Sequence, residues 1–129
     1  MKHHKFSASS LNVLNGVDMR LKEIAHRALE LSRVDFGIPS SGGLRTAEEQ
    51  NALYHGGKSQ LDGYEKKSYH QTGKALDVYA FVDSKASWDK EHLALVACAM
   101  LQAANELGYN LKWGAHLVNF VDMPHFEIP

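Results

Sequence analysis

Two segments of the sequence carry side chains that could bind a catalytic metal ion. His70 and Asp77 lie in the first segment, and Gly73 allows a sharp turn between them. His125 lies in the second segment, close to the C-terminal end. Imidazole nitrogen and carboxylate oxygen are ordinary zinc ligands, and a hydrolytic zinc site keeps one position for water. The residue types therefore predict a hydrolytic metal site, provided that the fold brings the two segments together.

Three more polar residues could assist such a site. Asp122 precedes His125 by three positions with Pro124 between them, so its carboxylate could lie near the metal and act as a general base. Glu127 would share a strand face with His125 and could orient its imidazole. Arg45 stands between a glycine-containing loop and a helix start. It could polarise a substrate carbonyl or hold a substrate carboxylate.

The same residues also have ordinary structural explanations. Asp77 could be a turn residue at the start of a strand, and Asp122 before a proline is a common turn former. Arg45 could simply be solvated ahead of a helix cap. The spacing by itself therefore leaves both interpretations open.

The apolar spacing predicts three helices that would surround these segments. The first runs from an Asp18 cap over residues 18–32, and the second opens at a capping box formed by Thr46 and Glu49 and ends at residues 56–57. The third would be capped by Ser87 and end at residue 108. Residues 58–72 are polar and predict a long surface loop, a kind of segment that is often functional.

Strands are expected where apolar and polar residues alternate. Residues 75–82 alternate strictly, which predicts a strand that buries Leu76 and Val78 and presents Asp77 to a cleft beside Tyr79 and Phe81. Shorter extended pieces are expected at residues 36–39, 109–113 and 125–128. Helices and short strands alternate without regular β-α-β units, so we predict one α+β domain over residues 1–129. It would have a small antiparallel sheet packed with about three helices, residues 1–6 being flexible.

Composition excludes several classes of function. The 129 residues carry 14 basic and 15 acidic side chains, a formal net charge of −1, and no basic surplus that would indicate nucleic-acid binding. No apolar run approaches the length of a membrane span, and the first residues are too polar for a signal peptide. We therefore expect synthesis in the cytoplasm without membrane insertion. The single cysteine, Cys98, falls in the apolar pattern of the third helix and is expected to be a core residue.

The motifs resemble a known family. The pattern S-x-H-x-x-G-x-A-x-D over residues 68–77 is similar to the signature of zinc D-Ala-D-Ala carboxypeptidases and L-alanyl-D-glutamate endopeptidases. Asp122 and His125 are similar to the second motif of that family, and residues 44–50 resemble its arginine segment. The family fold is the hedgehog/D-Ala-D-Ala-peptidase-like α+β domain, which agrees with the prediction from the residue patterns.

The resemblance implies a role for each matching residue. His70, Asp77 and His125 would bind one Zn²⁺ per chain. Asp122 would be the general base and Arg45 would stabilise the polarised carbonyl. The remaining matches would contact substrate or support the site, and they are Ser68, Glu127, Gln50 and Trp113.

The short length, Trp113-Gly114 and residues 124–127 look most like the phage endolysin branch, which cleaves peptidoglycan stem peptides between L-Ala and D-Glu. Trimming of terminal D-Ala and a non-catalytic zinc-binding module remain alternatives. Ala115, His116 and Leu117 depart from the branch pattern, and His116 could be a surface residue, a substrate contact or a competing ligand. A monomer without a separate wall-binding domain is expected, with a holin needed for access from the host cytoplasm to the periplasm and cell wall.

Overall fold

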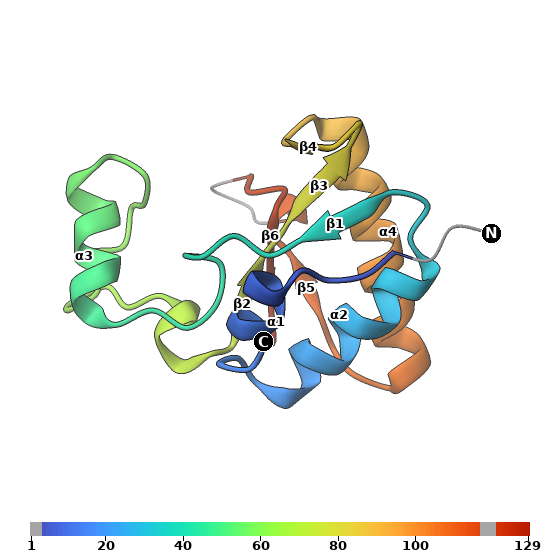
Figure 1. The fold of residues 1–129 in the computed structure, drawn as a ribbon. Helices are drawn as coiled ribbons and strands as arrows, with labels where there is room; N and C mark the ends of the chain where they lie inside the picture. Colours follow the sequence, from blue (N-terminus) through green and yellow to red (C-terminus); the bar gives the residue numbers. More distant parts are fainter. Residues whose placement is uncertain (1–3, 117–120) are drawn as a thin grey trace.

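The computed structural model describes residues 4–116 and 121–129, and these form an α+β fold (Figure 1). The four α-helices of this part are α1 (Ala8–Leu14), α2 (Met19–Leu31), α3 (Ala47–His55) and α4 (Lys90–Leu107). The six short strands are β1 (Asp35–Gly37), β2 (Ala75–Asp77), β3 (Tyr79–Val82), β4 (Lys85–Ser87), β5 (Lys112–Trp113) and β6 (His125–Glu127). Two 3-10 helices occupy Tyr69–Thr72 and Gly114–His116.

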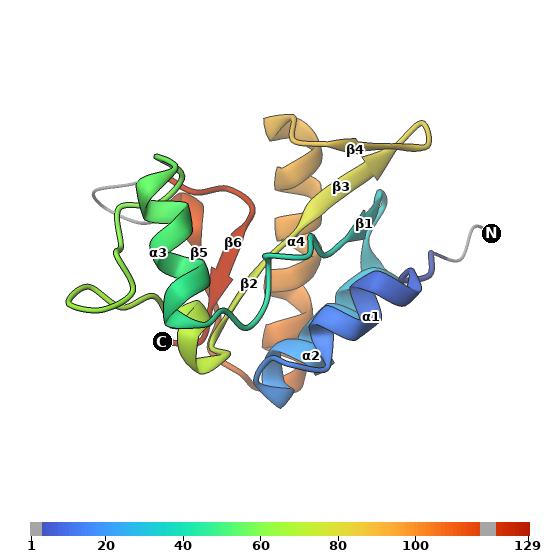
Figure 2. The ribbon, with the colours of Figure 1, turned by 60° about the vertical axis from the view of Figure 1, so that its left-hand side comes forward.

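The predicted fold class is confirmed, with two differences in its details. The strands form two antiparallel three-stranded sheets, in the orders β1-β3-β4 and β2-β6-β5, where one sheet was expected. The described residues also include α1, which the pattern did not predict. This helix has only 7 residues, and Leu14 and Ser10 are its buried side chains, so it shows little helical periodicity. Figure 2 shows α1 lying beside α2.

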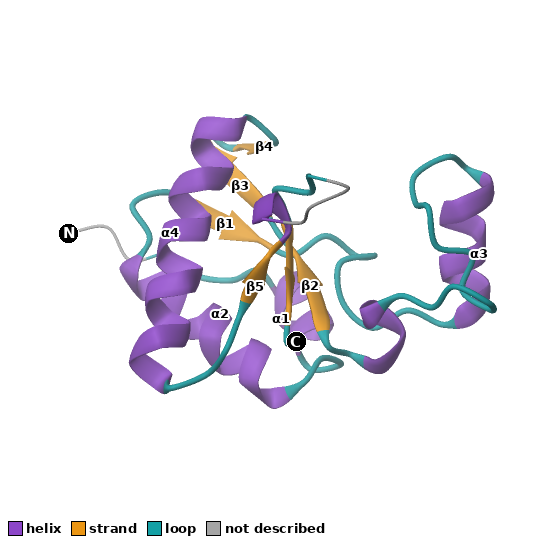
Figure 3. Cartoon of the chain, turned by 180° about the vertical axis from the view of Figure 1, so that it is seen from behind, coloured by secondary structure: helices purple, strands orange, loops and turns teal. Residues whose placement is uncertain are grey.

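The core lies between the sheets and the pair α2 and α4, which pack side by side (Figure 3). Arg27 of α2 and Glu106 of α4 join the two helices at their surface, with Nε and Oε2 2.7 Å apart. Helix α3 stands away from this core (Figure 1), and its single buried side chain is Gln50. The buried apolar side chains come from all the other layers and include Leu21, Ile24, Phe36, Leu76, Val78, Val96, Met100 and Phe126.

The predicted strand over residues 75–82 is divided at Val78. Strand β2 pairs with β6, whereas β3 pairs with β1 and β4. Val78 N–H donates to the Pro124 carbonyl at 2.9 Å, so the chain changes partners there without losing the hydrogen bond. The alternation holds in part: Leu76, Val78 and Ala80 are fully buried as expected, whereas Val82 is only partly buried and Ala75, on the other face, is buried as well.

Two predictions about α4 were wrong. Its N-cap is Asp89, and Ser87 is instead the last residue of β4. Cys98 is exposed. A helix turns about 100° per residue, which places Cys98 on the side of α4 opposite to the buried Val96 and Met100. No helix in the described ranges is long and apolar enough to cross a membrane.

Candidate active site

A pocket of about 430 Å³ lies where α3 and the loop after it face the sheet β2-β6-β5. Seven of the nine predicted site residues line it, together with side chains from α3 and its following loop. The lining residues are Ser41, Arg45, Leu53, Lys58, Ser59, Gln60, Leu61, Ser68, Tyr69, His70, Asp77, Asp122, His125 and Glu127.

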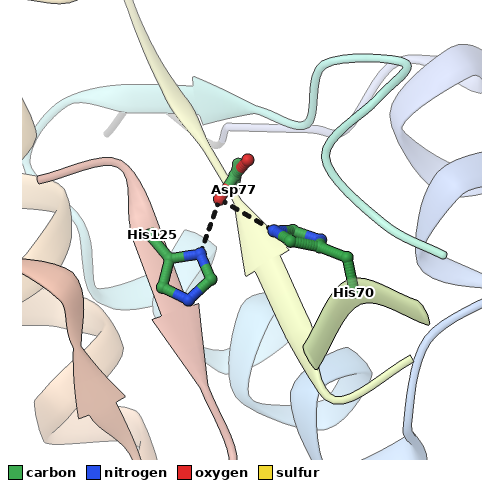
Figure 4. A group of neighbouring side chains, drawn as sticks. All are labelled: His70, Asp77 and His125. Atoms are coloured by element: carbon green, nitrogen blue, oxygen red, sulfur yellow. Dashed lines mark hydrogen bonds and ion pairs between the residues drawn. The ribbon is translucent and has the colours of Figure 1, made fainter. Parts of the chain in front are cut away.

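The antiparallel pairing of β2 with β6 brings two of the predicted ligands together. Asp77 is the register partner of His125, and His70 reaches the same point from the 3-10 helix beside β2. One donor atom from each of the three side chains lies within 4.8 Å of the other two. Figure 4 shows both imidazoles directed at one oxygen of Asp77. The described residues therefore contain a three-ligand cluster that could hold a metal ion.

The ring of His70 is fixed by a backbone carbonyl. Its Nδ1 lies 2.9 Å from the Gly43 oxygen, and a carbonyl can only accept, so Nδ1 is the donor. Nε2 is directed at the cluster and lies 3.3 Å from Asp77 Oδ1. This tautomer suits a metal ligand, because metal-binding histidines usually donate their second nitrogen to an oxygen.

Glu127 performs the corresponding function for His125. Its Oε1 lies 2.8 Å from Nε2, while Nδ1 lies 3.0 Å from Asp77 Oδ1. Strand geometry places residues 125 and 127 on one face of β6, as predicted. Glu127 is therefore placed to hold the imidazole with Nδ1 directed toward the other two ligands.

The charges of the cluster shift its acids and bases. Burial raises the pKa of Asp77, but hydrogen bonds from His125 and His70 outweigh it and hold that pKa well below its usual range. Burial lowers the pKa of His125, but the hydrogen bond and charge of Asp77, assisted by Glu127, leave it raised. Burial and the charge of Asp77 raise the pKa of Asp122. Asp77 thus stays ionised, as a metal ligand must.

Local hydrogen bonds hold the His70–Asp77 segment in shape. Ser68 Oγ accepts from His70 N–H at 3.2 Å and caps the 3-10 helix, and Gly73 ends that helix with φ +72°. This left-handed conformation favours glycine. Two backbone bonds join this segment to its neighbours. The Gly73 carbonyl accepts from Asp18 N–H at 2.8 Å, and the Gly42 carbonyl accepts from Asp77 N–H at 2.8 Å. Ser68 therefore has a structural role beside its place in the pocket wall.

Arg45 is paired rather than solvated. Its side chain is 10% exposed, and each guanidinium nitrogen has an acceptor. Nε donates to the Ser41 carbonyl at 2.7 Å, Nη1 to Gln50 Oε1 at 3.0 Å and Nη2 to Asp77 Oδ2 at 3.0 Å. The capping box of Thr46 and Glu49 forms as predicted and fixes the start of α3 directly after Arg45.

Gln50 lies behind the pocket wall and joins Arg45 to the loop after α3. Its side chain is fully buried, accepts from Arg45, and donates to Ser59 Oγ at 2.8 Å and to the Leu61 carbonyl at 2.9 Å. Its contact with Arg45 agrees with a supporting role. The predicted polar loop thus becomes one wall of the site.

The turn that carries Asp122 is held from the β5 side. Asp122 N–H donates to the Gly114 carbonyl at 3.0 Å, and Trp113 Nε1 donates to the Met123 carbonyl at 2.7 Å. A side chain at Gly114 would collide with the Asp122 carbonyl, which explains the glycine. Trp113 is therefore a support of the turn and does not line the pocket.

Some residues were placed differently or were not predicted. Tyr79 and Phe81 do not line the pocket, because β3 has turned to the other sheet. Their expected position beside the cleft was wrong. The unpredicted wall residues are Ser41, Leu53, Lys58, Ser59, Gln60, Leu61 and Tyr69, and the length of the polar loop was the available signal for most of them. The alternatives for the His116 side chain, and Leu117, lie outside the described part of the structure.

Comparison with known proteins agrees with this geometry. A family model described as phage L-alanyl-D-glutamate peptidase matches residues 2–128. The chain belongs to this family. It is 38% identical over 112 residues to the L-alanyl-D-glutamate peptidase of Escherichia phage T5, covering 86% of this chain and 80% of that protein. The crystal structure of the Serratia marcescens L-Ala D-Glu endopeptidase ChiX matches with a TM-score of 0.86 and 33% identity, over 99% of this chain and 92% of that one.

The family membership confirms the resemblance drawn from the motifs. The donor set also fits a metal of the zinc type, since it offers two imidazole nitrogens and one ionised carboxylate. In each imidazole the other ring nitrogen has an oxygen partner, the Gly43 carbonyl for His70 Nδ1 and Glu127 Oε1 for His125 Nε2. In this member of the family, His70, Asp77 and His125 are therefore the residues that could hold the metal ion.

Proposed function

We propose that the chain is a zinc-dependent endopeptidase that hydrolyses the L-Ala–D-Glu bond of peptidoglycan stem peptides. The observation that carries the proposal is the meeting of His70, Asp77 and His125 in a pocket that also contains Asp122 and Arg45. Membership of the phage L-alanyl-D-glutamate peptidase family supports the choice of bond over the trimming of terminal D-Ala.

In this proposal His70, Asp77 and His125 hold one zinc ion. When bound, zinc acts as a Lewis acid on the scissile carbonyl and makes water a stronger nucleophile at neutral pH. Gly43 and Glu127 fix the two imidazoles before the metal arrives, which lowers the cost of assembling the site.

Asp122 is proposed as the general base. It lines the pocket, and its raised pKa brings it closer to the working pH, so that it can take a proton from the attacking water and return it to the departing amine of D-Glu. Asp122 N–H donates to the Gly114 carbonyl, and Trp113 Nε1 donates to the Met123 carbonyl. These two bonds fix the position of Asp122 relative to His125. Correct placement of such a group is a large part of its effect.

Arg45 is proposed to stabilise the negative charge that develops on the carbonyl oxygen. A guanidinium has five N–H donors, and three of those of Arg45 are used by Ser41, Gln50 and Asp77. Two remain for the oxyanion. Because the group is already held in place, it need not reorganise during the reaction.

The biological role that follows is lysis of the host cell by a phage endolysin. The enzyme would be made in the host cytoplasm and reach the cell wall after a holin opens the membrane. We propose that it acts as a monomer.

The test compares two variants with a matched control. Asp122→Asn should retain zinc but lose about a hundredfold or more in activity, the usual contribution of general acid–base catalysis. His125→Ala should lose both zinc and activity, and Asp83→Asn, in the β3–β4 turn, should lose neither. Mass spectrometry of digested peptidoglycan should detect new glutamate amino termini. Full activity of Asp122→Asn would refute the base assignment, and release of free D-Ala alone would refute the proposed bond.

A further inference from the structure

The pocket contains one cation that no described residue neutralises. Among the described residues, the lysine and arginine side chains that line it are Arg45 and Lys58. Arg45 is paired with Asp77 and also bound to Gln50 and Ser41. The side chain of Lys58 has no hydrogen bond or ion pair with any residue in the ranges 4–116 and 121–129. Its charge is therefore available to a ligand.

The backbone holds Lys58 in a defined position at the end of α3. Lys58 N–H donates to the Leu53 carbonyl at 2.9 Å, and Gly57 has φ +74°, which is the usual way in which a glycine ends a helix. The next residues are held by Gln50 through Ser59 Oγ and the Leu61 carbonyl. Since Gln50 also binds Arg45, Lys58 and the metal cluster are connected through one buried side chain.

The proposed substrate brings a charge that this pocket must accommodate. A glutamate residue acylated on its nitrogen has two carboxyl groups, and when the chain continues through one, the other remains as a free carboxylate. That carboxylate would enter a pocket already lined by Asp77, Asp122 and Glu127. Like charges in a partly desolvated site repel one another unless a cation is close.

We infer that Lys58 binds the free carboxylate of the D-Glu residue on the leaving side of the scissile bond, and so determines specificity for an unamidated substrate. This inference rests on the proposed function. Lys58 would act in binding and not in the chemical step, because its charge meets a part of the substrate that does not change during hydrolysis. Uniform binding of this kind changes KM and leaves kcat nearly unchanged.

The experiment uses two synthetic peptides and the zinc-loaded enzyme. Both peptides contain an L-Ala–D-Glu bond and continue through one glutamate carboxyl, and the other carboxyl is free in the first peptide and amidated in the second. Lys58→Met keeps the backbone N–H that binds Leu53. It should raise KM for the carboxylate peptide about tenfold, as expected for one charge-assisted hydrogen bond, and leave the amidated peptide unaffected.

Two further variants make the result specific. Lys58→Arg keeps the positive charge and should retain most of the preference for the carboxylate peptide. Lys66→Met removes another exposed lysine of the same loop that does not line the pocket, and it should cleave both peptides like the wild type.

The outcomes separate this inference from the proposed function. Equal losses on both peptides, or no loss on either, would overturn the assignment of Lys58 while leaving the endopeptidase activity established. A wild-type enzyme that cleaves neither peptide would overturn the proposed function, and the inference with it. A selective rise in KM for the carboxylate peptide is the result that supports Lys58.

Discussion

Replacing Gln50 with leucine tests whether one buried side chain holds two parts of the site together. Leucine has a similar size but no hydrogen-bonding atoms, so the change removes the bonds to Arg45, Ser59 and Leu61. Ser59 Oγ keeps its bond from Leu61 N–H at 3.1 Å and stays satisfied. The substitution leaves the Leu61 carbonyl and Arg45 Nη1 without the hydrogen bond that Gln50 provides to each.

The size of the effect follows from these three bonds. A net hydrogen bond contributes about 1 kcal/mol, and a buried group left without a partner costs about 1–3 kcal/mol. We expect the free energy of unfolding to fall by about 2–4 kcal/mol, which corresponds to a decrease of roughly 10 °C in melting temperature for a domain of this size. Activity should also fall, because Arg45 and the loop wall lose a shared anchor.

The assay is thermal unfolding followed by circular dichroism at a fixed zinc concentration, because ligand binding itself shifts the melting temperature. Gln60→Leu is the control, since Gln60 is an exposed glutamine of the same loop. Zinc content should be unchanged in both variants, because Gln50 contacts none of the three ligands. If Gln50→Leu unfolds at the same temperature as Gln60→Leu, the proposed link between Arg45 and the loop is wrong.

Two further predictions concern residues that shape the site from outside. Gly114→Ala should lower kcat by at least tenfold and reduce the free energy of unfolding by about 1–3 kcal/mol, because a Cβ would push away the Asp122 carbonyl. Steady-state kinetics of this variant, with Ala115→Gly as the control, test the prediction. An unchanged kcat would contradict it. The hydrogen bond from Arg20 holds the pKa of Asp18 below its ordinary value of 3.8, so Asp18 stabilises the fold above that value and the stabilisation disappears as the pH falls through the lowered pKa. The urea midpoint of the wild type should therefore exceed that of Asp18→Asn at pH 7, with a difference that shrinks below about pH 4. An unchanged difference at low pH would show that the charge of Asp18 is not the cause.

The elements predicted best are those with local causes. The capping box of Thr46 and Glu49 forms both of its bonds, and Asp18 caps α2 as expected. The alternation of residues 75–80 identified Leu76, Val78 and Ala80 as buried, although it did not indicate that Ala75 is buried as well. These features depend on residues within a few positions of one another, so the sequence contains all the information they need.

The features that were missed depend on partners distant in the chain. The alternation of residues 75–82 does not reveal that the strand changes sheets at Val78, because the cause is a carbonyl at Pro124. The wrong placement of Tyr79 and Phe81 follows from that change. Cys98 was misplaced because an apolar helix does not show from its sequence alone which arc faces α2.

For the site itself, the sequence determined the chemical groups and the tertiary structure determined their relations. The residue types of His70, Asp77 and His125 suit a metal site, but their spacing by itself left the ordinary structural explanations open. Their convergence depends on the register of β2 with β6, which joins residues 48 positions apart. Packing likewise determined that Arg45 pairs with Asp77 and that Lys58 lines the pocket. Side-chain chemistry belongs to each residue, but distances between remote segments are fixed only when a common core is buried.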